Sequence, residues 1–575
     1  MAFRRSPYLA SPTSSRVDLL LPTPSPSRER FLSPEPRVRY GCTSSNTSLT
    51  RTLCCEVAFS LAPDPREWGA ALHMDVNEPD DDLHNPDPRR DRYADSGGTF
   101  CTARGIANLG CLLVLVLGIL TLFHFTKKPV STLGGFNIGG INATGQLPSM
   151  PGNWGLIDLD TPQDAYTKSS YQNPGDQWDL VFSDEFNVDG RTFYPGDDPY
   201  WEAPDMHYWA TGDLEWYDPE AATTKGGYLR LTLSKVDPVN NHNLTYRSGM
   251  FCFTGGLIEA NVVLPGASNV AGLWPAIWTM GNLGRAGFGA TLEGMWPYSY
   301  DSCDVGTLPN QTYPGEQMPV AAVTNGDPKA NDMLSYLPGQ RLSACTCPGE
   351  SHPGPVHENG SYVGRSAPEI DIFEATVSQS AQWAPFNAAY AWMNTTDNLK
   401  IYNDTTVLNG YHGGAFQQTT SGLSTTDQNC YEMGGGCASV YAFEYKPGFD
   451  NAYITWVTAD KPVWTLMAAG MGPDPLTEIN QRPVSQEPMY IIANLGFSPN
   501  FGAIDFDNLQ FPTSMLVDYI RVYQPKDAHN IGCDPTDFPT RAYIEAYLEA
   551  YTNANLTSWK DDFNQPVPKN SLNGC

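Results

Sequence analysis

The chain has 575 residues, of which 63 are acidic and 34 are basic, so its formal net charge is −29. This balance excludes a nucleic-acid-binding protein, which needs a basic surface opposite the phosphates. The 52 glycines, 48 prolines and 12% aromatic residues favour turns and short strands over long helices. A carbohydrate cleft or a large β core uses this many aromatic rings.

Residues 1–104 are expected to form a disordered cytosolic tail. Proline, serine and arginine recur there, as in SPTSS, LPTPSPS and LSPEP, and long aliphatic runs are lacking. Such a segment buries too little apolar surface to offset the conformational entropy that folding removes. Its acidic and basic residues nearly balance, so the negative charge lies almost entirely after the tail.

Residues 105–126 are predicted to form one transmembrane signal-anchor helix, rather than a buried core helix or a cleaved signal peptide. The run GIANLGCLLVLVLGILTLFHF contains no Asp, Glu, Lys or Arg. As a helix it matches the hydrocarbon core of a bilayer, which is about 30 Å thick. Arginines before the run outnumber the two lysines after it, Lys127 and Lys128. This asymmetry predicts a cytosolic N-terminus.

Two features of the chain after this helix agree with a secretory lumen. Asn-x-Ser/Thr sequons lie at Asn142, Asn243, Asn310, Asn359, Asn394, Asn403 and Asn555, whereas only Asn46 precedes the helix. An even set of cysteines also follows and favours disulfides, at Cys252, Cys303, Cys345, Cys347, Cys430, Cys437, Cys533 and Cys575. The sequence leaves their pairing open, and a zinc site is the weaker alternative because no CxxC pair is present.

Residues 127–177, rich in Gly, Asn, Pro and Ser, are predicted to be a lumenal stalk. From residue 178 onward, short segments alternate apolar and polar residues, as in WDLVF, YLRLTL, LIEANVVL, YAFEY, AYITWV, YIIAN and VDYIRVY. This alternation predicts antiparallel strands, so residues 178–525 are expected to be all-β, with two packed sheets in a sandwich or jelly roll. Helical spacing occurs only near the end, and residues 526–575 are expected to be a C-terminal helical extension.

The sequence EIDIFE, which begins at Glu369, places three acids in an apolar strand. Glu369 and Asp371 are two residues apart and share a face, whereas Glu374 points to the other face in a regular strand. A one-residue bulge around Ile372 and Phe373 returns Glu374 to the face of the other acids. Clustered carboxylates repel one another, and at least one pKa rises as a result.

In that arrangement, Ile370 and one of Ile372 and Phe373 pack behind the acids. A fold selected for stability avoids such a cluster, but a retaining glycosidase uses it. One carboxylate attacks the anomeric carbon, and a protonated carboxyl gives its proton to the leaving oxygen. An acidic edge strand without chemistry is the alternative.

Several segments in chain order resemble glycoside hydrolase family 16, the laminarinase-like β-jelly-roll glucanases. They are LVFSDEF, DLEWY with GGYLRLTL, GGLIEANVVLP, GLWPAIW, the acid motif, ANLGF and MLVDYIRVYQ. The resemblance covers about residues 178–524 and implies a concanavalin A-like β-jelly-roll sandwich.

A second resemblance covers nearly all of the chain after residue 104. The anchored topology, the insert at residues 282–365, PEIDIFEATVSQSAQWAPFN and AYLEAYTNANLTSW are similar to the fungal β-1,6-glucan synthesis-associated proteins, the Kre/Skn family. This resemblance implies a single-pass type II membrane glycoprotein of the secretory pathway, with a lumenal or extracellular catalytic domain.

The resemblance implies that Glu369 is the nucleophile, Glu374 the acid/base and Asp371 the carboxylate that positions and tunes both. Trp274 and Trp278 are an even number of residues apart, so both can face one side of the sheet and bind sugar rings. The weaker candidates for sugar platforms are Trp209, Trp216, Trp296, Trp383 and Trp392. No metal site and no cofactor are expected.

Two departures from the laminarinase-like pattern bear on activity. A histidine is typical of the strand after the acid motif, but only the sequence AAY at residues 388–390 lies near that place. The insert before the acid motif is also much longer than in compact relatives, so it can narrow the cleft, or exclude water and favour transfer to another sugar.

Two functions of different classes are therefore expected. The first is a membrane-anchored retaining β-glucosidase- or glucanase-like enzyme, or a transglycosylase, that acts in fungal cell-wall β-1,6-glucan biosynthesis. The second is a non-catalytic glucan-binding scaffold or assembly factor for β-glucan synthesis. Both predict a β-glucan oligosaccharide or polysaccharide and a membrane as partners, and no nucleic acid.

Overall fold

The computed structural model describes residues 156–575, apart from residues 195–196, 199, 239–240, 242–245, 249, 252–255, 288–292, 376 and 554. All of them belong to one compact unit, Gly110–Cys575. The predicted tail, the predicted transmembrane helix and most of the predicted stalk lie outside the described residues. Within the described residues, no helix has the length and apolar character needed to span a bilayer.

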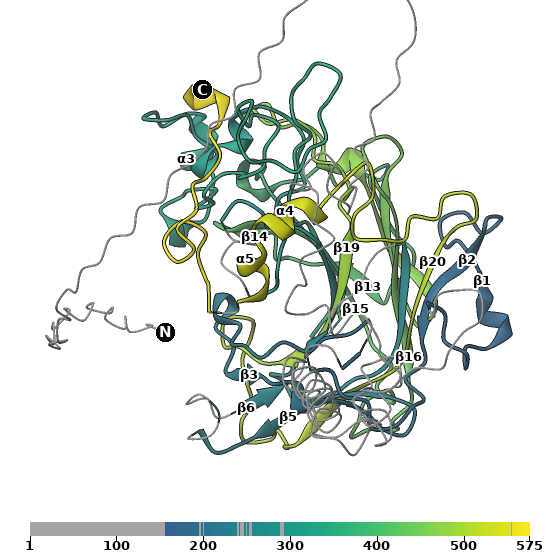
Figure 1. Ribbon diagram of the computed structural model, residues 1–575. Helices are drawn as coiled ribbons and strands as arrows, with labels where there is room; N and C mark the ends of the chain where they lie inside the picture. The colour runs from purple at the N-terminus through teal and green to yellow at the C-terminus, as the bar shows by residue number, and fades with distance from the viewer. Residues whose placement is uncertain are drawn as a thin grey trace, which may run out of the picture. The chain divides into compact units, whose positions relative to one another are not determined.

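The described strands form two sheets that pack face to face, and the predicted all-β sandwich is confirmed (Figure 1). The larger one, the back sheet, contains β1 (Thr167–Ser169), β2 (Gln177–Asp184), β3 (Glu215–Tyr217), β4 (Ala222–Thr224), β5 (Leu229–Lys235), β6 (Tyr246–Ser248), β8 (Leu257–Val263), β12 (Leu399–Ile401), β16 (Ser439–Lys446), β17 (Tyr453–Thr458), β18 (Lys461–Met467) and β20 (Thr513–Pro525). The smaller one, the cleft sheet, contains β7 (Met250–Phe251), β9 (Trp274–Gly281), β10 (Glu369–Glu374), β11 (Ser378–Trp383), β13 (Thr406–Leu408), β14 (Gly413–Gly414), β15 (Gln417–Ser424) and β19 (Met489–Gly496).

Neighbouring strands in both sheets are often distant in sequence. The back sheet runs β12-β18-β17-β16-β8-β20-β5-β6-β3, with β1, β2 and β4 joined to this path. The cleft sheet runs β13-β15-β11-β10-β9-β19-β7, with β14 paired to β15. All described pairs are antiparallel except β3 with β6. Strand β10, which carries the acid motif, therefore lies at the centre of the cleft sheet.

The core lies between the sheets, and β5 shows the alternation of apolar and polar residues that builds it. In β5, Leu229, Leu231 and Leu233 are fully buried, while the residues between them are partly exposed. Two tryptophans of the back sheet, Trp456 and Trp464, stack with ring centroids 4.0 Å apart at the centre of this core. All seven alternating segments of the sequence form strands, as predicted.

Helices are short and lie outside the sheets. The α-helices of the described residues are α3 (Val320–Thr324), α4 (Arg541–Ala546) and α5 (Leu548–Thr552). The 3-10 turns are η3 (Gln163–Tyr166), η4 (Trp209–Thr211), η5 (Pro219–Ala221), η8 (Val305–Thr307), η9 (Pro309–Gln311), η10 (Pro328–Ala330), η11 (Ala388–Tyr390), η12 (Ala468–Met471) and η13 (Ser571–Asn573). The predicted C-terminal helical extension is thus helical only in α4, α5 and the 3-10 turn η13, and irregular chain makes up most of its described residues.

Three disulfides are formed by described cysteines, as the even number of cysteines predicted. They join Cys303 to Cys345, Cys347 to Cys575 and Cys430 to Cys437. Cys252 lies outside the described residues. The first two bridges tie the long insert to itself and to the C-terminal end of the chain.

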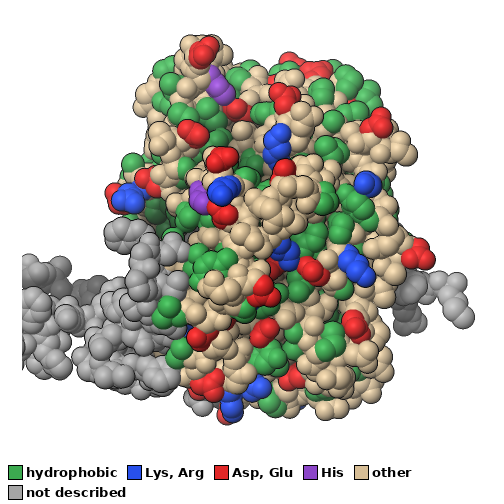
Figure 2. Space-filling model, turned by 90° about the vertical axis from the view of Figure 1, so that its right-hand side faces the viewer, with side chains coloured by type: hydrophobic (Ala, Val, Ile, Leu, Met, Phe, Trp, Pro, Cys, Tyr) green, Lys and Arg blue, Asp and Glu red, His purple; other side chains and the backbone are tan. Residues whose placement is uncertain are grey.

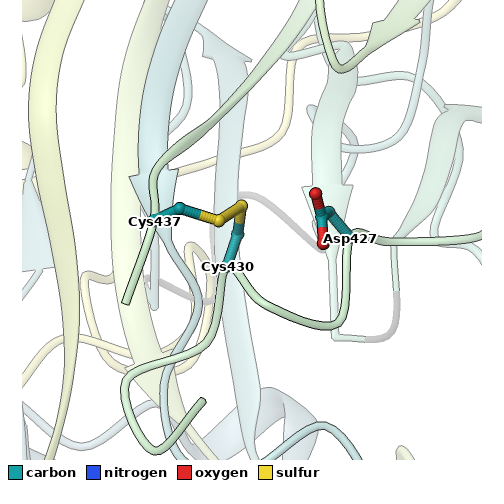
Figure 3. A group of neighbouring side chains, drawn as sticks. All are labelled: Asp427, Cys430 and Cys437. Carbon is teal, nitrogen blue, oxygen red and sulfur yellow. A yellow bond between two sulfur atoms is a disulfide. The ribbon is translucent and has the colours of Figure 1, made fainter. Parts of the chain in front are cut away.

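One group of side chains among the described residues has the spacing of a metal site. The Asp427 carboxylate and the sulfurs of Cys430 and Cys437 lie within 4.8 Å of one another. The two sulfurs are bonded to each other, however (Figure 3). A disulfide offers no thiolate to a metal, so this group is a disulfide with a neighbouring acid and does not support the zinc alternative.

Side chains of both charges are visible on one face of the molecule (Figure 2). Acidic and basic side chains are dispersed among polar ones on the face shown in Figure 2, and the described residues there form no continuous basic patch.

Candidate active site

The predicted bulge in β10 is confirmed, and it brings the three acids onto one face. The register against β9 shifts by one residue between Asp371 and Phe373. Glu369, Asp371 and Glu374 consequently pair with β9 residues that are two apart and share a face: Met280, Trp278 and Ala276. Against β11 they pair with a second set of alternating residues: Gln382, Ser380 and Ser378.

The apolar residues of β10 face the core. Ile370, Ile372 and Phe373 all belong to the cluster between the two sheets. The sequence predicted that only one of Ile372 and Phe373 packs behind the acids, and this part was wrong. The bulge turns both of these consecutive side chains toward the core, which fixes the strand from behind.

The acids lie at the floor of a cleft of about 940 Å³ on the outer face of the cleft sheet. Glu369 and Glu374 are half-buried and line this cleft, whereas Asp371 is fully buried beneath them. Aromatic side chains form much of the wall: Tyr208, Trp209, Tyr217, Trp274, Trp278, Trp296 and Phe501. Polar side chains from β15 and the loop before it also line the cleft: Asn409, Gln417, Thr419 and Ser421.

Each acid accepts at least one hydrogen bond from a neighbouring side chain. The indole nitrogen of Trp296 donates to Glu369 Oε2. Trp274 Nε1 donates to Glu374 Oε1 at 3.2 Å. Asp371 Oδ2 accepts hydrogen bonds from two side chains of β11, at 2.6 Å from Ser380 Oγ and 3.1 Å from Gln382 Nε2.

Burial and mutual repulsion raise the pKa of all three carboxyl groups. Burial raises the pKa of Glu369 well above its usual range, and the charges of Asp371 and Glu374 raise it further. Burial raises the pKa of Glu374 well above its usual range too, with a smaller contribution from the charge of Asp371. Burial raises the pKa of Asp371 to about 6, against the opposing hydrogen bonds from Ser380 and Gln382. The cluster therefore holds protons near neutral pH.

Glu369 and Asp371 shift each other's pKa in opposite directions. Asp371 Oδ1 has no donor within the hydrogen-bond network of the described residues. The interaction with Asp371 raises the pKa of Glu369, and the same interaction opposes the rise at Asp371. A raised pKa disfavours the ionised form of Glu369, whereas the role implied by the resemblance needs that form.

Both predicted sugar platforms line the cleft. Trp274 is half-buried and stacks on Phe501 with ring centroids 4.0 Å apart. Trp278 is 8% exposed, and its Nε1 donates to Asn494 Oδ1 at 2.9 Å. Contacts within the protein therefore hold both rings in place without a bound sugar.

The weaker platform candidates divide into two groups. Trp209 and Trp296 line the cleft. Trp216 does not line it and donates instead to Asp205 Oδ1. Trp383 and Trp392 are buried in the core between the sheets.

Sequence reasoning missed a second pair of acids at the cleft. Asp213 lines the cleft, and Glu215 lies fully buried two residues further on. The Tyr217 hydroxyl donates to Asp213 Oδ2 at 3.0 Å, and the absence of a Cβ at Gly496 leaves room for Glu215. Burial raises the pKa of Asp213, and it raises that of Glu215 well above its usual range. The segment DLEWY carried the signal, since its two acids are two residues apart.

The strand after the acid motif presents serine and glutamine where a histidine was expected. Strand β11 is that strand, and the AAY sequence forms η11 beyond it. Gln382 Oε1 accepts from Thr419 Oγ1 at 2.7 Å and from Gln417 Nε2 at 3.2 Å. Because Gln382 Nε2 also donates to Asp371, this glutamine connects the polar wall of the cleft to the acid cluster.

Among solved structures, the chain is similar to "endo-beta-1,3-glucanase from Pyrococcus furiosus", at 18% identity and a TM-score of 0.33 over 63% of this chain and 98% of that one. It is also similar to "the laminarinase catalytic domain from Thermotoga maritima MSB8", at 19% identity and a TM-score of 0.31 over 61% of this chain and 99% of that one.

Sequence comparison places the chain in one family. The family model described as "Beta-glucan synthesis-associated protein SKN1/KRE6/Sbg1" matches residues 70–575. The chain is 44% identical over 535 residues to "Beta-glucan synthesis-associated protein KRE6" of Saccharomyces cerevisiae, covering 88% of this chain and 69% of that protein. It is 42% identical over 531 residues to "Beta-glucan synthesis-associated protein SKN1" of Candida albicans, covering 88% and 68%. The chain therefore belongs to the SKN1/KRE6/Sbg1 family of β-glucan synthesis-associated proteins.

Proposed function

We propose that this protein is a retaining β-glucan hydrolase or transglycosylase that acts in β-1,6-glucan synthesis. Glu369 is the nucleophile, Glu374 the acid/base and Asp371 the residue that positions both. One observation carries the proposal: a bulge in the central strand of the cleft sheet gathers three acids at the floor of an aromatic-lined cleft. A strand without a chemical role gains nothing from this repulsion.

The reaction has two steps at the anomeric carbon. In the first, a Glu369 oxygen bonds to that carbon while the glycosidic bond breaks and Glu374 gives its proton to the leaving oxygen. In the second, the Glu374 carboxylate takes a proton from water or a sugar hydroxyl, and the oxygen of that acceptor displaces Glu369. The acceptor alone decides between hydrolysis and transfer.

The side chains of the cleft support a β-glucan substrate. The faces of sugar rings pack on tryptophan, and the half-buried Trp274 lies next to Glu374. On β15, Gln417, Thr419 and Ser421 offer hydrogen-bond donors and acceptors for sugar hydroxyls.

The raised pKa of Glu369 favours a second function, that of a glucan-binding assembly factor without turnover. Burial and the neighbouring acids raise the pKa of Glu369 well above its usual range, which disfavours its ionised form. A protonated carboxyl group is a poor nucleophile, yet it still donates a hydrogen bond to a bound sugar.

The test compares the full-length protein, purified in detergent, with its Glu369→Gln variant. Both are incubated with β-1,3- and β-1,6-linked gluco-oligosaccharides, and product lengths are read by mass spectrometry. We expect shorter or longer products from the wild type and from the control variant Glu220→Gln, which alters an exposed acid. Unchanged oligosaccharides in every sample, with binding retained, contradict the enzyme and leave the assembly factor.

We also propose that residues 105–126 anchor the protein as a single-pass type II membrane protein of the secretory pathway. Exposed sequons at Asn359, Asn394 and Asn555 support a lumenal location of the sandwich. In sealed microsomes, protease should remove an N-terminal tag but spare the sandwich, and an N-glycosidase should reduce its mass. A protected tag, or a sandwich without glycans, contradicts this topology.

A further inference from the structure

The geometry points to Trp296 as a positioning residue for Glu369, held against that carboxylate by the C-terminal extension of the chain. The inference rests on the proposed function, because it concerns how the proposed nucleophile is oriented. It assigns a role in the active site to two segments that belong to neither sheet, the insert between β9 and β10 and the last residues of the chain.

The first contact joins the insert to the nucleophile. Trp296 is half-buried and lines the cleft, and its Nε1 donates to Glu369 Oε2. The preceding residue, Met295, is fully buried, and its carbonyl oxygen accepts the Ala367 N–H at 2.9 Å. Ala367 lies just before Glu369 in the chain, so the insert holds the start of β10 as well as its carboxylate.

The second contact joins the same stretch of the insert to the C-terminal extension. A carboxylate oxygen of Glu293 accepts the backbone N–H of Trp559. The Gly294 carbonyl oxygen accepts the Arg341 N–H at 2.9 Å. A Cβ at Gly294 would lie 2.5 Å from the Gly339 carbonyl oxygen, so only glycine allows this approach.

The Trp559 ring closes this arrangement, which we call the clasp: residues 293–296, Arg341 and Trp559. The Arg341 guanidinium lies 3.6 Å from the centroid of the Trp559 ring. Both residues are almost fully buried, at 3% and 1% exposure. A cation held against an aromatic face away from water is strongly attracted to it.

Further contacts hold the extension on the insert. The Cys347–Cys575 disulfide ties the last residue of the chain to the insert, and the Cys347 N–H donates to the Lys569 carbonyl oxygen at 2.9 Å. Near α4, Asn282 Nδ2 donates to Thr540 Oγ1 at 2.8 Å. Tyr543 of α4 and Ala550 of α5 pack in one cluster with Trp278 of β9, and Figure 1 shows both helices beside the cleft sheet.

Besides its packing, the clasp places the Trp296 indole N–H where it affects the ionisation of Glu369. A donor to a carboxylate favours its ionised form, which is the form that a nucleophile needs. Among the described residues, three other titratable groups face Glu369: Asp371 and Glu374 on its own strand, and Tyr208 from the loop before η4. Trp296 is the donor that opposes the negative charge of these neighbours.

The first test is Trp296→Phe in the full-length protein. Phenylalanine keeps an aromatic ring in place but removes the donor. We expect the acid limb of the kcat/KM profile to move to higher pH by about one unit, because Glu369 ionises less readily. The matched control Trp216→Phe also removes an indole–carboxylate hydrogen bond, but one outside the cleft, and should leave the profile unchanged.

The second test changes a clasp residue that does not line the cleft. Glu293→Ala removes the acceptor of the Trp559 N–H, so we expect a smaller shift in the same direction. The double variant should shift no further than Trp296→Phe alone, because both changes act through one contact. Shifts that add contradict the proposal, since they mean that the extension does not act through Trp296.

An infrared titration separates this inference from the proposed function. The carboxyl stretch of Glu369, identified by its absence in Glu369→Gln, reports ionisation whether or not the protein turns over glucan. A band that titrates at higher pH in Trp296→Phe supports the positioning role even in an inactive protein. An unmoved band overturns it. If Trp296→Phe fails to fold, the same band in Glu293→Ala decides the question.

Discussion

Asp371 has the most enclosed carboxyl group of the three acids, and its titration should be visible in the stability of the whole fold. Burial raises its pKa from 3.8 to about 6, so the folded state binds this proton more tightly than the unfolded chain. The stability that this proton contributes is complete below pH 3.8 and is lost as pH rises through 6. Ser380 and Gln382 limit the loss by donating to the ionised form.

The Asp371→Asn variant cannot ionise at this site. We expect its free energy of unfolding at pH 7 to exceed that of the wild type by about 1–3 kcal/mol, with the difference vanishing near pH 4. Denaturant unfolding at pH 4 to 7 measures this, with Asp205→Asn as an exposed control. A variant that is less stable than the wild type at pH 7 would show that the ionised Asp371 stabilises the fold.

Trp209 offers a simpler test of sugar binding, because its indole ring lies at the cleft with 41% of its surface exposed. We expect Trp209→Ala to weaken oligosaccharide binding about 3- to 30-fold and to leave the unfolding midpoint unchanged. Calorimetry in a Glu369→Gln background separates binding from turnover. Trp216→Ala removes a ring outside the cleft and serves as the control; equal losses in both variants would place sugar binding elsewhere.

The strands and the bulge in β10 could be predicted from the sequence because each has a local pattern. Alternation encodes the strands, and acids at positions i, i+2 and i+5 of one strand share a face only with a bulge. The clasp has no such pattern. Trp296 contacts Glu369, and Trp559 contacts Glu293, across long stretches of irregular chain. In the sequence, nothing distinguishes the residues of the clasp from other loop residues, because only the fold brings them together.

The close approach of the two sheets depends on one glycine of β15. A Cβ at Gly422 would lie 2.7 Å from Nε1 and 2.8 Å from Cδ1 of Trp464, a fully buried ring of β18. The stacked Trp456 holds that ring in place, so it has little room to move.

We therefore expect Gly422→Ala to destabilise the fold by about 1–3 kcal/mol, as overpacking of a core usually does. Gly410→Ala is the matched control, because a Cβ there meets nothing within 4 Å. Thermal unfolding of both variants measures the difference. Equal midpoints would mean that the sheets move apart at little cost.

At the scale of the whole molecule, the disulfides differ most in how much chain they close. The Cys347–Cys575 bridge spans a sequence separation of 228 residues, whereas Cys430–Cys437 spans 7. A cross-link stabilises the native state mainly by restricting the unfolded chain, and this restriction grows with the logarithm of loop length. The long bridge should therefore contribute about 3 kcal/mol more than the short one.

Paired replacements test this without leaving a lone thiol. We expect Cys347→Ser with Cys575→Ser to lose more stability than Cys430→Ser with Cys437→Ser, by several degrees in Tm. The long bridge also holds the extension on the insert, so its loss should move the Glu369 carboxyl band toward higher pH, while loss of the short bridge should not. A large loss of stability with an unmoved band would mean that the extension supports the fold but does not position Glu369.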